Sequence, residues 1–200
     1  CSKLKEIEFA ENCELHSICK SAFFESGINK ITIPRNVTSI SEMTFSDCHR
    51  LKEVNLSEIS IIEKRAFSMS AIESIFIPSS VKIIEEQAFD YCTLLKKIHF
   101  AEDSELCSFG CATFRMSSIE NIVIPKLVKT IENSLFSLCE KLNTVEVLGK
   151  EICLEKNSFE NCYHLLIISF PNAAKVSIYV SNLPRNLTLF VCPCQQIFIY

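Results

Sequence analysis

The sequence predicts a repeat solenoid: a single curved array with a parallel β-sheet on one face and short helical turns or loops opposite. Two observations lead to this prediction. A phenylalanine recurs about every 22 residues through most of the 200-residue chain, and an apolar triplet with strand spacing lies between successive phenylalanines. Periods of 20–50 residues are typical of solenoids, because one repeat cannot bury its own apolar side and needs stacked neighbours.

The phenylalanine anchors are separated by 22, 22, 22, 25, 22 and 23 residues. They are Phe23, Phe45, Phe67, Phe89, Phe114, Phe136 and Phe159. A small residue precedes most of them, which indicates that neighbouring repeats approach closely there. Ile84, Ala88, Phe89 and Cys92 have the spacing of residues on one face of a helix. We therefore expect a short helical turn around each anchor.

The apolar triplet has the pattern apolar-x-x-apolar-x-apolar and occurs eight times. The triplets begin at Leu4, Ile28, Leu51, Ile72, Leu95, Ile119, Leu142 and Leu165. The last two apolar residues of each are two apart, so we expect both to point into the core and the residue between them to point outward. Pro34, Pro78 and Pro125 follow three triplets, and we expect each to end its strand because proline lacks an N–H donor.

The repeat template ends near Phe170. We expect residues 1–170 to form the repeat array, in units of about 22–25 residues, and residues 171–200 to form irregular C-terminal rungs or a cap. The first residue is not Met, and the last four residues are an apolar run that makes a poor polar cap. We therefore expect the sequence to be a fragment of a longer protein, so its lack of a signal peptide says nothing about the parent.

Composition argues against several classes of function. Twenty Lys and Arg against 24 Asp and Glu give a net charge of −4, too small and too evenly spread for a nucleic-acid binder. No apolar stretch reaches the roughly 18–20 residues of a membrane helix. Three glycines leave no phosphate-binding loop. The four histidines occupy different repeat positions without an acid and a nucleophile, so we expect no catalytic residue, no cofactor and no enzymatic activity.

Cysteine is abundant, with 12 residues. One position, three residues after the anchor, holds either cysteine or serine. Its members are Ser26, Cys48, Ser70, Cys92, Ser117, Cys139 and Cys162. We interpret it as a small buried slot whose thiol or hydroxyl bonds the turn backbone. The other cysteines lack paired zinc-site spacing, so we expect no metal, although a Cys192–Cys194 disulfide stays open.

The outward residues of successive strands should form columns on one surface, which is where repeat proteins commonly bind partners. We predict a protein-binding patch on the central strands, with Phe76, Lys97 and His99 in its middle. The predicted binding residues are Glu53, Asn55, Phe76, Lys97, His99, Asn121 and Val123. The alternative is a solvated strand face without a ligand.

Several repeat positions together resemble a known family. Residues 72–84 and 84–100, with their spaced isoleucines, Pro78, Phe89 and Cys92, resemble the BspA-like class of leucine-rich repeats. The resemblance extends over residues 4–170, apart from the 25-residue unit and Glu151, which stands where an apolar residue is expected.

The resemblance implies a non-enzymatic protein-binding module. Members are typically cell-surface or secreted proteins of anaerobic bacteria and mucosal protists, implicated in adhesion to host matrix proteins and to other microbes. It therefore implies a host matrix or cell-surface protein as partner. The alternative is an intracellular, cytoplasmic scaffold or regulatory domain. Glycosylation at the sequons of Asn36, Asn55 or Asn186 would favour the first, and free thiols would favour the second.

Overall fold

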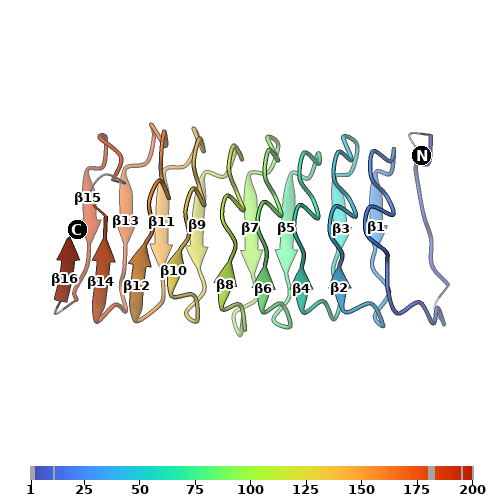
Figure 1. Ribbon diagram of the computed structural model, residues 1–200, viewed down its shortest axis with the longest axis horizontal. Coiled ribbons are helices and arrows are strands. Elements are labelled where there is room, and N and C mark those ends of the chain that lie inside the picture. The colour runs from blue at the N-terminus through green and yellow to red at the C-terminus, as the bar shows by residue number, and fades with distance from the viewer. Residues whose placement is uncertain (1–2, 11, 180–182, 195, 200) are drawn as a thin grey trace.

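A computed structural model shows a β-solenoid whose rungs stack along one axis (Figure 1). It describes residues 3–10, 12–179, 183–194 and 196–199. The secondary-structure elements in these ranges are all β-strands. The strands are β1 (Lys30–Thr32), β2 (Ser39–Ile40), β3 (Glu53–Asn55), β4 (Ile61–Ile62), β5 (Ser74–Ile77), β6 (Ile83–Ile84), β7 (Lys97–Phe100), β8 (Ser108–Phe109), β9 (Asn121–Ile124), β10 (Thr130–Ile131), β11 (Thr144–Val147), β12 (Glu151–Leu154), β13 (Ile167–Ser169), β14 (Lys175–Ile178), β15 (Leu189–Val191) and β16 (Gln196–Ile199).

The strands form two parallel faces. The odd-numbered strands lie side by side on one face, in the groups β1-β3, β5-β7 and β9-β11-β13-β15. The even-numbered strands form the other, in the groups β2-β4-β6-β8 and β10-β12-β14-β16. Figure 1 shows the two sets pointing in opposite directions, because the chain turns a corner between the two strands of each rung. The predicted parallel solenoid is confirmed, and the second strand set is additional to it.

The anchors form a continuous ladder in the core. Six consecutive pairs of rings, from Phe23–Phe45 to Phe136–Phe159, stack with centroids 5.2–5.8 Å apart. The anchors from Phe45 onward are almost completely buried. Offset stacking contributes roughly 0.5–1.5 kcal/mol per pair beyond the burial itself. The ladder thus joins the consecutive turns from Phe23 to Phe159.

The helical turn expected around each anchor is not formed in any described rung. In an α-helix each N–H binds the carbonyl four residues earlier. Here the N–H of Phe89 donates to the carbonyl of Thr113 in the next rung, 2.9 Å away, and the N–H of Gln87 donates to Cys111 at 3.0 Å. The intervening Ala88 donates within its own rung, to Glu85 at 3.2 Å. Hydrogen bonds between rungs therefore replace those of the helix.

Backbone conformation explains this pattern. The residues two positions before and two positions after every anchor have φ between 53° and 61°, and none of them is glycine. Around Phe67, for example, Arg65 has φ 55° and Met69 has φ 58°. This left-handed conformation costs an ordinary residue roughly 1–2 kcal/mol. It also prevents the backbone from continuing as a right-handed helix.

The prolines end strands as predicted. Pro78 directly follows β5 and Pro125 directly follows β9, while Pro34 lies two residues after β1. The carbonyl of Pro78 accepts a hydrogen bond from the N–H of Val81 at 3.2 Å, which closes a tight corner. Each proline thus starts the turn that leads to the second strand of its rung.

Both strand sets continue beyond residue 170. There β15 pairs with β13, and β14 pairs with both β12 and β16. The division between an array at 1–170 and irregular rungs or a cap at 171–200 stays a prediction. In the described part of the chain, no helix has the length and apolar character needed to cross a membrane.

Candidate functional site

The exposed side chains of the odd-numbered strands form one surface, which we call the strand face. Alternation along each strand creates it: in β5, Ser74 and Phe76 point outward, whereas Ile75 and Ile77 are buried. Parallel pairing in register then aligns the outward residues of successive strands. The same alternation follows from the triplet pattern in the sequence.

All seven predicted binding residues are exposed on the strand face. Glu53 and Asn55 lie on β3, Phe76 on β5, Lys97 and His99 on β7, and Asn121 and Val123 on β9. Two of them are large apolar side chains: Phe76 is 55% exposed and Val123 is 49% exposed.

The structure brings only some of these residues together. Phe76 lies directly opposite His99 in the β5–β7 register. Glu53 instead forms an ion pair with Lys30, 3.3 Å away, toward the N-terminal end of the array. Asn55 donates a hydrogen bond from Nδ2 to the Oγ1 of Thr32 at 3.2 Å. Glu53 and Asn55 therefore bind their neighbours in the preceding rung.

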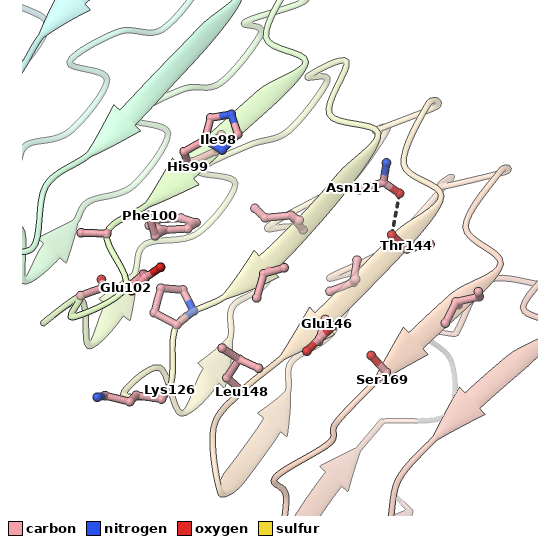
Figure 2. A pocket seen from close by; sticks show the side chains of 17 residues that line it. Ile98, His99, Phe100, Glu102, Asn121, Lys126, Thr144, Glu146, Leu148 and Ser169 are labelled. Carbon is pink, nitrogen blue, oxygen red and sulfur yellow. Dashed lines mark hydrogen bonds between the residues drawn. The ribbon is translucent and has the colours of Figure 1, made fainter.

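A groove of about 680 Å³, which we call the C-terminal groove, crosses the strand face over β7, β9, β11 and β13 (Figure 2). Of the predicted residues, His99, Asn121 and Val123 line it. Asn121 accepts a hydrogen bond from the Oγ1 of Thr144 on β11, marked by the dashed line in Figure 2. Phe76 and Lys97 lie outside its lining.

Three charged residues of this groove were not predicted. Glu102 lies in the corner after β7, Lys126 follows Pro125, and Glu146 projects from β11. Glu102 and Lys126 lie in corners, and the apolar triplet pattern predicts only the residues of the strands. The corner of Glu102 did leave a signal, since the unit between Phe89 and Phe114 has 25 residues instead of 22.

The groove combines unpaired charges with apolar surface. Within the described ranges, none of Glu102, Lys126 and Glu146 forms an ion pair, so these charges are available to a ligand. The half-buried ring of Phe100 and the side chain of Leu148 supply apolar surface beside them. Among the same residues, no cluster of three or more His, Cys, Asp or Glu could hold a metal ion.

The alternating cysteine and serine position is part of the architecture. The Sγ of Cys92 donates to the carbonyl of Phe67 at 3.0 Å and lies 3.5 Å from the Oγ of Ser70. Burial raises the pKa of the Cys92 thiol to about 12 and that of Cys139 to about 11. Burial and these hydrogen bonds confirm the interpretation of this position as a small buried slot whose thiol bonds the turn backbone.

The remaining described cysteines are more accessible. Cys19, Cys107 and Cys111 are exposed and free. Cys192 and Cys194, the pair that the sequence left open, are joined by a disulfide.

Known families and structures agree with this architecture. The chain matches the family described as BspA type leucine rich repeat region in six copies, over residues 1–96 and 60–182. A leucine-rich repeat protein from Bacteroides ovatus has a similar fold, with 22% identity and a TM-score of 0.64. That match covers 96% of this chain and 64% of the other, so this chain spans less than two thirds of its length.

A leucine-rich repeat protein from T. pallidum is also similar, at 22% identity and a TM-score of 0.70. The match covers 78% of this chain and 74% of the other. At this identity the likeness shows the fold alone. No curated protein matches the sequence.

Proposed function

Because this chain belongs to the BspA-type leucine-rich-repeat family, we propose that it is a non-enzymatic protein-binding module whose strand face holds the partner. The observation that supports this most is the exposure of Phe76 and Val123 on rigid strands beside the C-terminal groove. Exposed aromatic side chains are enriched where proteins bind one another. Extended faces of solenoids commonly serve this purpose.

The proposed setting is the cell surface or the secreted fraction, with a host matrix or cell-surface protein as the partner. Its support is the family, whose members are typically surface or secreted adhesion proteins. In this setting the strand face acts as an adhesion surface.

A second candidate is an intracellular scaffold or regulatory domain that uses the same strand face. Nine of the described cysteines are free thiols, which supports a reducing compartment. Free thiols persist more readily there than outside the cell. Both candidates place the partner on the same residues, so one experiment tests the shared part of the proposal.

The test measures binding of the chain to immobilised fibronectin, laminin and collagen. A strand-face variant carries Phe76→Ala, Lys97→Ala and His99→Ala. A matched control carries Met69→Ala, Lys141→Ala and His49→Ala. It removes the same kinds of side chain from the turn side, by which we mean the turns around and just after the phenylalanine anchors. For the matrix protein that binds most tightly, the strand-face variant should raise Kd about tenfold or more, whereas the control should stay within about twofold.

Two outcomes would contradict the proposal. Equal losses of binding affinity in the two variants, at unchanged unfolding midpoints, would show that the strand face is not the binding surface. Absence of binding to all three matrix proteins by the wild-type chain would contradict the adhesion role.

A further inference from the structure

The sequence contains a longer repeat of 91 residues, superimposed on the short one. Residues 7–40 align without a gap to residues 98–131, and 15 of the 34 positions are identical. The identities include positions outside the short template, such as Ala10 with Ala101, Glu14 with Glu105 and the serine at 17 and 108. The segment 7–40 therefore recurs once, 91 residues later, which is four rungs along the array.

A groove lies over each copy of this segment. A second groove of about 460 Å³, which we call the N-terminal groove, lies over the first rung and β1. Ten of its eleven lining residues correspond, 91 positions later, to residues that line the C-terminal groove. The corresponding pairs include Phe9 and Phe100, Pro34 and Pro125, and Arg35 and Lys126.

A longer corner builds one wall of each groove. Phe9 and Ile18 are nine positions apart, as are Phe100 and Phe109, whereas Ile77 and Ile84 are only seven apart. The residues of the longer corner form the first wall, and the proline corner of the next rung forms the second. The two grooves thus share a cause as well as a composition.

The two grooves carry the same number of unpaired charges, although only the cations Arg35 and Lys126 occupy corresponding positions and the carboxylates do not. In the N-terminal groove, Glu6, Glu8 and Arg35 form no ion pair with any described residue, whereas Lys30 is paired with Glu53. The C-terminal groove has two unpaired carboxylates, Glu102 and Glu146, and one unpaired cation, Lys126. Each groove therefore presents two carboxylates and one cation around an apolar floor.

The geometry points to two equivalent sites for a basic, extended polypeptide segment, which a partner occupies at the same time. This inference rests on the proposed function and names the chemistry of its partner. In each groove, a Lys or Arg side chain of the partner pairs with the carboxylates, and an adjacent apolar side chain packs on the phenylalanine and proline. The excess of one negative charge in each groove favours a basic ligand over an acidic one.

Rung spacing sets the separation of the two motifs on the partner. Parallel strands lie about 4.8 Å apart, so four rungs separate the grooves by about 19 Å. An extended chain rises about 3.3 Å per residue and covers this distance in about six residues. Phe76 lies on β5, between the two grooves, where it contacts the middle of such a segment.

The test compares two fluorescent peptides by anisotropy at low salt. One has two Arg-Phe pairs six residues apart in a Ser/Thr background, and the other has one pair replaced by Ser-Ser. Occupation of both grooves should make the two-pair peptide bind at least about tenfold more tightly than the one-pair peptide. In the variant Glu102→Lys with Glu146→Lys, this advantage should disappear, whereas the matched variant Glu140→Lys with Glu160→Lys should keep it.

Three results would overturn the inference. The first is equal binding of the two peptides, and the second is a two-pair advantage that persists in the groove variant. The third is displacement of the peptide by heparin, with heparin binding that depends on Arg35 and Lys126. The last would identify a polyanion as the occupant. If the peptides fail while Phe76→Ala with Lys97→Ala and His99→Ala still weakens matrix-protein binding, only the paired basic sites are contradicted. If that variant also binds normally, the proposed function is contradicted as well.

Discussion

Two rungs approach closely at Gly110, in the 25-residue unit. A Cβ at this position would overlap the backbone nitrogen of Glu86 in the preceding rung. Backbone cannot move away as a flexible side chain can. Other units have side chains at the equivalent position, for example Glu85, so the requirement for glycine belongs to the 25-residue unit.

Gly110→Ala should lower the free energy of unfolding by about 1–3 kcal/mol, because the added methyl group forces two rungs apart. Urea denaturation followed by circular dichroism measures this change. Asp103→Ala, in the exposed corner of the same unit, is the control and should stay within about 0.5 kcal/mol of wild type. An unchanged midpoint for Gly110→Ala would show that the rungs are not in close contact there.

Met69 tests the left-handed turn positions. It has φ 58° and is 41% exposed, so its conformation matters more than its packing. Met69→Val should destabilise the protein by about 1–2 kcal/mol, because a β-branched residue tolerates positive φ poorly. Met69→Gly should be nearly neutral, because relief of strain offsets the greater freedom of the unfolded chain. Equal midpoints for the two variants in urea would contradict the left-handed assignment.

At the scale of elements, the phenylalanine ladder is the main connection between rungs. Phe89 stacks on Phe67 at 5.2 Å and on Phe114 at 5.8 Å, and it is fully buried. Phe89→Ala should therefore cost about 3–5 kcal/mol, as is usual for buried aromatic residues. Phe76→Ala makes the same chemical change on the strand face and should cost about 0.5 kcal/mol or less. Similar unfolding midpoints for these two variants would contradict the ladder.

The column of buried thiols predicts a loss of stability in alkali. Burial raises the pKa of Cys92 to about 12 and that of Cys139 to about 11, from an ordinary value of 9.0. The folded state therefore keeps protons that the unfolded state releases, so this stabilisation is complete below pH 9 and declines as the pH rises above it. Between pH 9 and 11 the loss should be roughly 1 kcal/mol per pH unit for each thiol.

Cys92→Ser with Cys139→Ser removes these titrating groups while leaving a hydroxyl in each slot. Its unfolding free energy should fall less steeply than that of wild type across the same pH range. Parallel pH profiles for the two proteins would mean that the thiols are not buried as described.

At the scale of the whole molecule, the repeat fold is predictable because every rung buries the same residue types. Ile31, Phe45 and Pro78 each mark a fixed position within a single rung. Residues that recur at a regular spacing in the sequence therefore stack in a column in the structure. The Cys92 slot follows for the same reason. The buried positions that recur in every repeat are therefore enough to predict most of the fold from the sequence.

The turns and the grooves depend on contacts between rungs, which a period does not encode. Ile84, Ala88 and Cys92 have helical spacing, yet the N–H of Ala88 donates within its own rung and that of the adjacent Phe89 donates to the next rung. Likewise, Glu102 and Lys126 lie on different rungs and line one groove only because a long corner stands beside a proline corner. The strand-face residues were predictable one by one, whereas the groove that joins them required the stacked structure.

The central claim, that the strand face is the binding surface, is tested most directly by carboxylate footprinting. The chain is labelled with a carbodiimide and glycine ethyl ester, free and in complex with the matrix protein that it binds most tightly. Labelling of Glu53, Glu102 and Glu146 should fall about twofold or more in the complex, because bound protein shields them, while Glu140 and Glu160 on the turn side keep their labelling. Protection of Glu140 and Glu160 with unchanged labelling of the strand-face carboxylates would contradict the claim.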